Sequence, residues 1–170
     1  MMKIEDHQRE YVIWQNRAVR FYLAARLLAL SQLWPATAFC AQQALEDLLK
    51  ATLVFHDKSF NPQHAGHKLT KMLRTLKNKV PNSQSVNVPP YFYHDNRFRL
   101  VTRYPVGHEM VGIPSSLLDD LDRSFVDLLV LVDFQFNTQL KSIIRSGKHL
   151  KVLQRDNKQL ARLLDFLSSH

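Results

Sequence analysis

The chain has 170 residues, a length that suggests a single domain with a substantial hydrophobic core. It carries 23 Lys and Arg against 15 Asp and Glu, and the net charge of +8 favours polyanionic partners such as RNA, nucleotides or acidic proteins. Its only cysteine, Cys40, excludes an internal disulfide, and it has neither a signal-peptide-like start nor an apolar run of ~20 residues, so we expect a soluble cytoplasmic protein without a membrane span.

Apolar residues that recur at steps of three and four predict two long helices at the start of the chain. The first is expected over about residues 5–31 and the second over about residues 35–55, where Pro35 suits the first helical turn. Residues 57–66 contain an Asn-Pro pair and a glycine, which predict a loop. A shorter helix is expected over residues 67–77.

Residues 80–114 are predicted to be irregular, because five prolines exclude a long helix there. Basic and apolar side chains alternate in its second half, which places Arg97, Arg99 and Arg103 on one side of an extended chain. The aromatic residues around these arginines leave two interpretations open. They stack on the bases of single-stranded RNA, or they fasten the segment to the core.

Two more helices are expected at the end of the chain. Residues 115–147 carry a long apolar stripe that ends at a glycine, and residues 148–167 carry an apolar face and a basic face. We therefore predict an all-α fold, an antiparallel four-helix up-and-down bundle over residues 1–147. Residues 148–170 are expected to add a basic amphipathic C-terminal helix to the same domain. The acidic residues of the fourth helix are candidates to pair with that basic face.

Three short motifs occur in order within this helical pattern: QALEDLLKA at 43–51, HKL at 67–69 and RYP at 103–105. Over about residues 15–145 the chain resembles the HEPN family (higher eukaryotes and prokaryotes nucleotide-binding domain). The resemblance implies a helical bundle that binds nucleotides or RNA and acts as a homodimer or with a partner protein. It also implies a possible place in a toxin–antitoxin or nucleotidyltransferase-linked system.

The resemblance also implies candidate catalytic residues. RNA-cutting members carry an Arg followed, after four to six residues, by a His, and here Arg103 and His108 are separated by four. A histidine near neutral pKa suits removal of the 2′-hydroxyl proton, and an arginine fork suits the charge on phosphate. The residue after the Arg is Tyr104, however, and the Arg-Tyr-Pro form is more typical of members proposed to bind nucleotides.

For nucleotide or RNA binding, the candidate residues are Lys50, His67, Arg97, Arg99 and Tyr104. Lys50 follows Glu46 by four residues, so it either forms a surface ion pair or contacts phosphate in a cleft. His67 is interpreted as a cap or as a core contact to the second helix. A further basic segment lies in the short third helix and comprises Lys68, Lys71, Arg74, Lys77 and Lys79.

No cofactor or metal site is predicted. The histidines between residues 56 and 67 lack a cysteine pair and a fourth ligand at a firm spacing. Four scattered glycines exclude a glycine-rich phosphate loop. The leading function is a nucleotide- or RNA-binding module. The alternatives are a metal-independent endoribonuclease that uses Arg103 and His108, and a helical interaction scaffold without a ligand of its own.

Overall fold

The computed structural model describes residues 4–93, 113–132, 153–154, 156–159, 161–162 and 165. Every regular element within these residues is helical and none is a strand, which confirms the all-α prediction. The antiparallel four-helix arrangement and the division at residue 147 stay predictions, because most of residues 133–170 lie outside the described part.

Two long helices form an antiparallel pair. They are α1 (Ile4–Leu30) and α2 (Trp34–His56), and both agree with the predicted spans to within about two residues. The chain turns between them through Gln32, which has a left-handed φ of 56°. The Thr37 hydroxyl donates to the Leu33 carbonyl at 3.0 Å and so fixes the start of α2.

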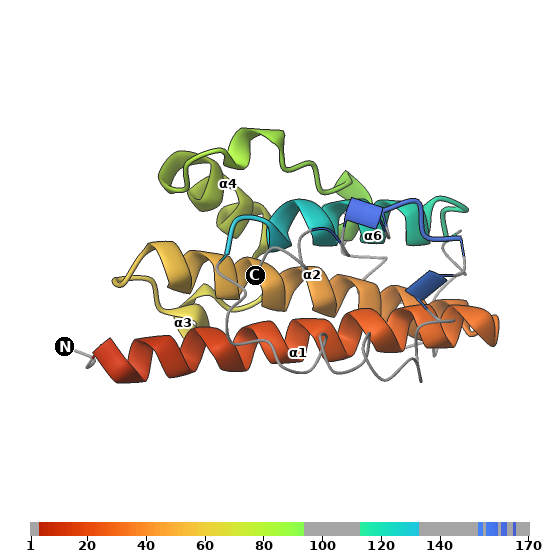
Figure 1. Cartoon of the computed structure of the whole chain (residues 1–170), viewed down its shortest axis with the longest axis horizontal. Helices are drawn as coiled ribbons and strands as arrows, with labels where there is room; N and C mark the ends of the chain where they lie inside the picture. Colours follow the sequence, from red (N-terminus) through yellow and green to blue (C-terminus); the bar gives the residue numbers. More distant parts are fainter. Residues whose placement is uncertain are drawn as a thin grey trace.

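Helix α2 is the centre of the fold. It contacts α1, α4 (Leu69–Lys79) and α6 (Leu117–Leu129), which lie around it (Figure 1). Every residue from position 40 to position 54 is therefore buried. A helix that is covered on all sides is expected to be apolar throughout, and the polar residues in this stretch are exceptions that need a reason.

The predicted loop at residues 57–66 contains a short helix, α3 (Pro62–Ala65), so the prediction of a plain loop is wrong there. The Asn61 side chain caps this turn, because its Oδ1 accepts from the amides of Gln63 at 2.9 Å and His64 at 3.1 Å. Proline at the first helical position costs no hydrogen bond. The Asn-Pro pair was thus a helix start as well as a loop signal.

Residues 80–93 are irregular apart from two single turns, η1 (Ser83–Ser85) and η2 (Pro90–Phe92), as predicted for this part of the 80–114 segment. The segment is nevertheless held firmly. The Ser83 hydroxyl donates to the Leu76 carbonyl at 3.0 Å, and Gln42 Nε2 donates to the Phe92 carbonyl at 3.0 Å.

Helix α6 ends at Leu129, so the prediction of one continuous helix over residues 115–147 is wrong at residues 130–132. His56 Nε2 lies 2.6 Å from the carbonyl oxygen of Leu131. A continuing helix would offer that oxygen to the amide four residues later. The contact from α2 therefore competes with propagation of α6.

The predicted C-terminal helix over residues 148–167 is also interrupted, at residues 156–159. Asp156 has a left-handed φ of 52°, and Asn157 Oδ1 accepts from the Gln159 amide at 2.9 Å. Asn and Asp side chains compete with helical hydrogen bonds in this way. The predicted pairing of this segment with the acidic residues of α6 is found in two ion pairs, Lys158 with Asp119 and Arg162 with Asp127.

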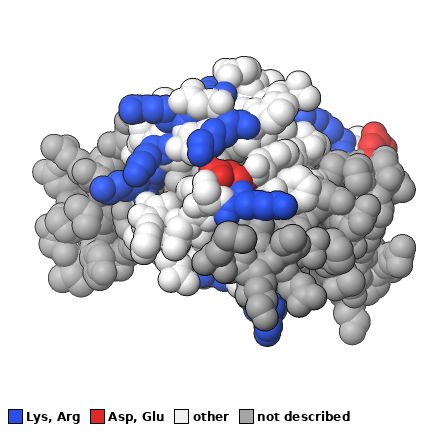
Figure 2. Space-filling view, turned by 90° about the vertical axis from the view of Figure 1, so that its left-hand side faces the viewer, with Lys and Arg blue, Asp and Glu red and all other residues white. Residues whose placement is uncertain are grey.

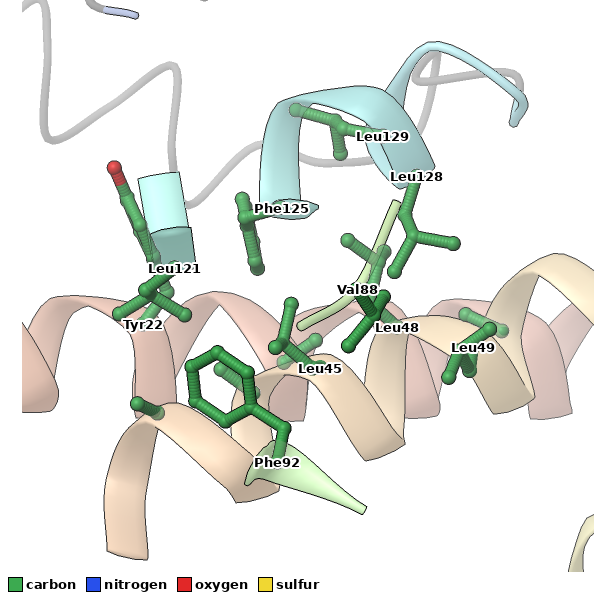
Figure 3. Close-up of a cluster of buried hydrophobic side chains, with 14 of the residues drawn as sticks. Tyr22, Leu45, Leu48, Leu49, Val88, Phe92, Leu121, Phe125, Leu128 and Leu129 are labelled. Atoms are coloured by element: carbon green, nitrogen blue, oxygen red, sulfur yellow. The ribbon is translucent and has the colours of Figure 1, made fainter. Parts of the chain in front are cut away.

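The core joins α1, α2, α6 and the irregular segment. Leu45, Leu48 and Leu49 of α2 belong to this core, with Leu45 and Leu48 next to side chains of α6, and the Tyr22 ring of α1 stacks on Phe125 at a centroid distance of 4.2 Å (Figure 3). These side chains are fully buried. Each such residue typically contributes about 1.5–3 kcal/mol to stability through burial.

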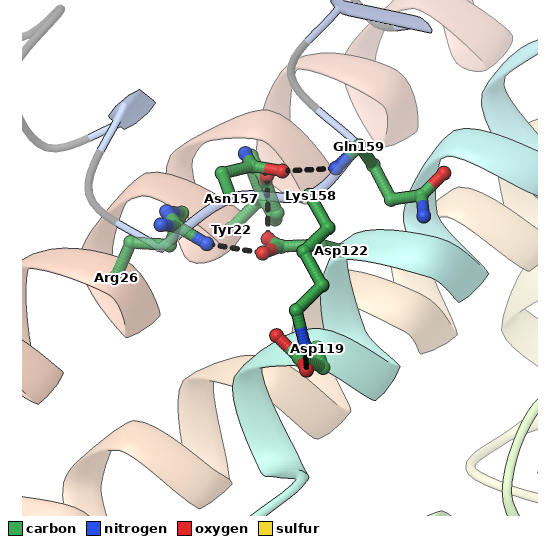
Figure 4. A network of polar contacts seen from close by, with 7 residues as sticks. All are labelled: Tyr22, Arg26, Asp119, Asp122, Asn157, Lys158 and Gln159. Carbon is green, nitrogen blue, oxygen red and sulfur yellow. Dashed lines mark hydrogen bonds and ion pairs between the residues drawn. The ribbon is translucent and has the colours of Figure 1, made fainter.

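One buried polar network lies at the edge of this core (Figure 4). The Tyr22 hydroxyl donates to Asp122 Oδ1 at 2.7 Å, and Arg26 pairs with the other oxygen of the same carboxylate. Asn157 Nδ2 donates to the Tyr22 hydroxyl at 3.2 Å. Burial raises the pKa of Asp122, and Arg26 opposes that shift. This network ties the described C-terminal residues to α1 and α6.

Candidate functional site

Four polar side chains occupy one face of α2 within its buried stretch. Gln43, Glu46, Asp47 and Lys50 are spaced at three, four and seven residues, which aligns them along the helix. All four are less than a tenth exposed. Burial of charged groups is costly unless they are paired, and such clusters occur often at functional sites.

Glu46 is the centre of this buried charged cluster. Its Oε1 lies 2.9 Å from Lys50 Nζ and 2.7 Å from His67 Nδ1. Two of the predicted site residues, Lys50 and His67, therefore meet at one carboxylate. The predicted contact of His67 with the second helix is confirmed. The interpretation of Glu46 and Lys50 as a surface pair is wrong, because their side chains are only 2% and 5% exposed.

The Glu46–His67 contact has a chemical consequence. A carboxylate oxygen only accepts, so the proton of this hydrogen bond is carried by Nδ1 of the imidazole. This holds the ring in one orientation and leaves Nε2 as the second nitrogen of a half-exposed side chain.

Asp47 is a buried carboxylate whose charge is poorly compensated. Its side chain is fully buried, and neither oxygen has a hydrogen bond of good geometry. The nearest cation is Arg17 of α1, whose Nε lies 3.4 Å from Oδ2. Burial raises the pKa of Asp47 to about 6, with a smaller contribution in the same direction from Glu46, and Arg17 opposes the rise.

Trp14 of α1 lies against the cluster. The Arg17 guanidinium and the Lys50 ammonium each lie 4.6 Å from the centre of its ring. Both positions are within the range of cation–π attraction. Trp14 and Arg17 were not predicted as site residues, because only the packing of α1 on α2 brings them there. The sequence did carry a signal for Asp47, because it directly follows Glu46 as a second acidic residue within an apolar helix.

A second charged feature is the basic face of α4, which we define as Lys68, Lys71, Arg74 and Lys77. All four side chains are exposed, and within the described part of the chain none has an acidic partner. Lys79 differs, since it pairs with Asp57 at 2.6 Å, and this bond lowers the pKa of Asp57 to about 2. Lys and Arg side chains gather on this end of the molecule around a small acidic patch (Figure 2).

The remaining predicted site residues, Arg97, Arg99, Arg103, Tyr104 and His108, lie outside the described residues. Among the residues that are described, no three His, Cys, Asp or Glu side chains form a group able to hold a metal ion. The helices of the described part are each too short or too polar to cross a membrane.

A comparison with protein-family models matches residues 11–122 to the HEPN domain. The chain belongs to the HEPN family. The match runs from α1 into α6 and therefore contains the buried charged cluster, the basic face of α4 and the Arg103–His108 motif of this HEPN protein. Comparisons with curated proteins and with solved structures gave no match.

Proposed function

We propose that this HEPN protein binds RNA or nucleotides through the basic face of α4. The observation that carries the proposal is that Lys68, Lys71, Arg74 and Lys77 are exposed and have no acidic partner among the described residues. Unneutralised cations on one face attract phosphate groups and release counterions on binding. Membership of the HEPN family supports the same class of ligand.

The buried charged cluster contacts the start of this basic face through the pair of Glu46 and His67. Lys50 is only 5% exposed and already contacts Glu46 and Trp14, so direct phosphate binding by Lys50 would require it to leave both. We propose instead that Glu46 and Lys50 are positioning residues. They hold His67, which directly precedes Lys68, at the start of the basic face.

Neutralising two cations of the basic face is expected to weaken RNA binding and its salt dependence. For Lys68→Gln combined with Lys71→Gln, we expect the slope of log K against log salt concentration to fall by about 1.4, or about 0.7 for each lost contact with single-stranded RNA. The measurement is fluorescence anisotropy with a labelled single-stranded RNA over a series of salt concentrations.

The matched control removes the same net charge from cations that already have acidic partners. Arg123 pairs with Asp120 and Lys158 with Asp119. Replacing both of these cations with Gln should leave the slope within experimental error of the wild-type value. Equal losses in the two double variants would assign binding to net charge alone, and a wild-type protein that binds no RNA would reject the proposal.

As an alternative we propose a metal-independent endoribonuclease. The Arg-x4-His spacing of Arg103 and His108, within the range matched to the HEPN domain, favours it. This alternative predicts cleavage of RNA in EDTA, with cleavage lost in Arg103→Ala and His108→Ala because each removes a catalytic group. Gel analysis of the RNA is the measurement. Intact RNA after prolonged incubation with pure wild-type protein would end this alternative.

The assembly of the protein is part of the proposal. A homodimer would bring two Arg103–His108 motifs to one cleft, as the resemblance implies, and a nucleotidyltransferase partner would fit a linked two-protein system. Light scattering of the pure protein distinguishes a dimer from a monomer. A scaffold without its own ligand would bind no RNA and would retain a second polypeptide through purification.

A further inference from the structure

A pocket of about 460 Å³ lies between α4 and the irregular segment that follows it. This volume is in the range of small-molecule sites, about 300–1,000 Å³. One wall is a single face of α4, because the residues that it contributes are spaced at three, four, seven and eight. They are Thr70, Leu73, Arg74, Lys77 and Asn78.

The opposite wall is built from the segment between Gln84 and Tyr93, and it is fixed in place. Val86 and Val88 are buried and form its apolar base. The main-chain carbonyl of Asn87 accepts from the Ser124 hydroxyl at 3.1 Å, which fastens the wall to α6. The pocket is thus formed before any ligand arrives, which lowers the entropic cost of binding.

The polar groups of the pocket have a consistent chemistry. Arg74 and Lys77 supply two cations, and no carboxylate is found among the described residues that line the pocket. Gln84 Nε2 donates to the Lys77 carbonyl at 2.8 Å, which sets the orientation of its amide. Further amides come from Asn78 and Asn87. Cations recognise phosphate, and amides recognise the edges of bases.

Tyr93 completes the lining with an aromatic ring next to the apolar base. Aromatic rings are the usual stacking partners of nucleobases in proteins that bind single-stranded nucleic acid. We propose that this pocket binds one nucleoside monophosphate unit. Its phosphate lies against Arg74 and Lys77, and its base lies between Tyr93 and the valines. This inference rests on the proposed function and gives it a specific site.

The neighbouring pocket of about 240 Å³ has a different chemistry. It is lined by Asp57 as well as by Lys71 and Lys79, and Lys79 is paired with that carboxylate. An anion there would meet a negative charge and an already neutralised cation. The described residues therefore favour the pocket at Arg74 and Lys77 for phosphate.

The test compares two neutralising substitutions on the same helix. Lys77→Gln removes a cation of the pocket, and Lys68→Gln removes a cation of the same basic face that does not line it. Binding of adenosine 5′-monophosphate, adenosine and inorganic phosphate is measured by isothermal titration calorimetry, together with a short RNA with and without a 5′-phosphate. Thermal unfolding of each variant checks that the fold is kept.

We expect Lys77→Gln to weaken binding of adenosine 5′-monophosphate by about tenfold, and Lys68→Gln by less than about twofold. Tyr93→Leu should weaken the nucleotide but not inorganic phosphate. If adenosine 5′-monophosphate binds more tightly than either RNA, the ligand is a free nucleotide. If the 5′-phosphorylated RNA binds most tightly, the ligand is the 5′ end of an RNA.

Equal effects of Lys77→Gln and Lys68→Gln would overturn the pocket assignment. So would a wild-type protein that binds RNA with the expected salt dependence but neither the mononucleotide nor the 5′-phosphate, and in that case the proposed function would stand. If Tyr93→Leu leaves nucleotide binding unchanged, the site is one for phosphate rather than for a nucleotide, and the assignment also fails. A wild-type protein that binds neither RNA nor nucleotide would contradict both this assignment and the proposed function.

Discussion

Asp47→Asn is expected to make the protein more stable at pH 7 and to remove a pH dependence of its stability between about pH 4 and pH 6. The Asp47 pKa rises from 3.8 in the unfolded chain to about 6 in the fold, chiefly because the carboxyl is buried. A shift of about two units corresponds to about 3 kcal/mol.

The sign follows from proton binding. Between pH 4 and pH 6 the folded state holds the Asp47 proton more tightly than the unfolded chain does, so the free energy of unfolding falls as pH rises. Asn carries no charge at any pH and avoids this loss. Urea unfolding of both proteins at pH 4, 5, 6 and 7 is the measurement. The raised pKa of Asp122 affects both proteins alike and cancels in their difference.

Asp57→Asn is the matched control, because it makes the same chemical change at a carboxyl whose pKa is shifted the other way. Hydrogen bonds from Lys79 and Ser59 lower the pKa of Asp57 to about 2. Asp57 therefore adds stability above pH 4, and this contribution is lost as pH falls toward 2. Asp57→Asn should reduce stability at pH 7. If the free energy of unfolding varies with pH in the same way for wild type and Asp47→Asn, the pKa of Asp47 is not raised in the fold.

Glu46→Gln is expected to destabilise the protein by about 3–5 kcal/mol, since it leaves the buried Lys50 ammonium without its carboxylate. The same change removes the charged acceptor of His67. The midpoint of urea unfolding at pH 7 measures the loss. A Glu46–Lys50 pair on the surface would cost less than about 1 kcal/mol, so a loss of that size would contradict the buried cluster.

A double variant separates the lost pairing from the buried charge. Combining Glu46→Gln with Lys50→Met removes both charges and should recover a large part of the stability that Glu46→Gln alone loses. If the stability losses of Glu46→Gln and Lys50→Met, each measured alone, simply add in the double variant, the two residues do not interact in the folded protein. The buried ion pair would then be excluded as the reason for the effect.

The helices that sequence analysis predicted well are those with a regular apolar periodicity. Periodicity placed α1 and α2 to within about two residues, and α4 is shifted by only two. The all-α class followed from the same signal. The Glu46–Lys50 spacing predicted an ion pair, but its burial depends on how α1, with Trp14, packs over α2.

Several of the failures involve a contact between distant parts of the chain. The end of α6 at Leu129 is accompanied by the contact of His56 with the Leu131 carbonyl, 75 residues away. The break at residues 156–159 combines a local turn of Asn157 with its bond to Tyr22. The pocket beside Arg74 also depends on the fold, because its second wall comes from a segment without periodicity.

The placement of Trp14 beside two cations has a practical consequence for spectroscopy. The protein has two tryptophans, and Trp34, at the start of α2, is 40% exposed. Indole emission is sensitive to nearby charge, and Arg17 and Lys50 both lie over the Trp14 ring. With Trp34 replaced by Phe, the remaining fluorophore would serve as an intrinsic optical probe of the helix pair, without any attached dye.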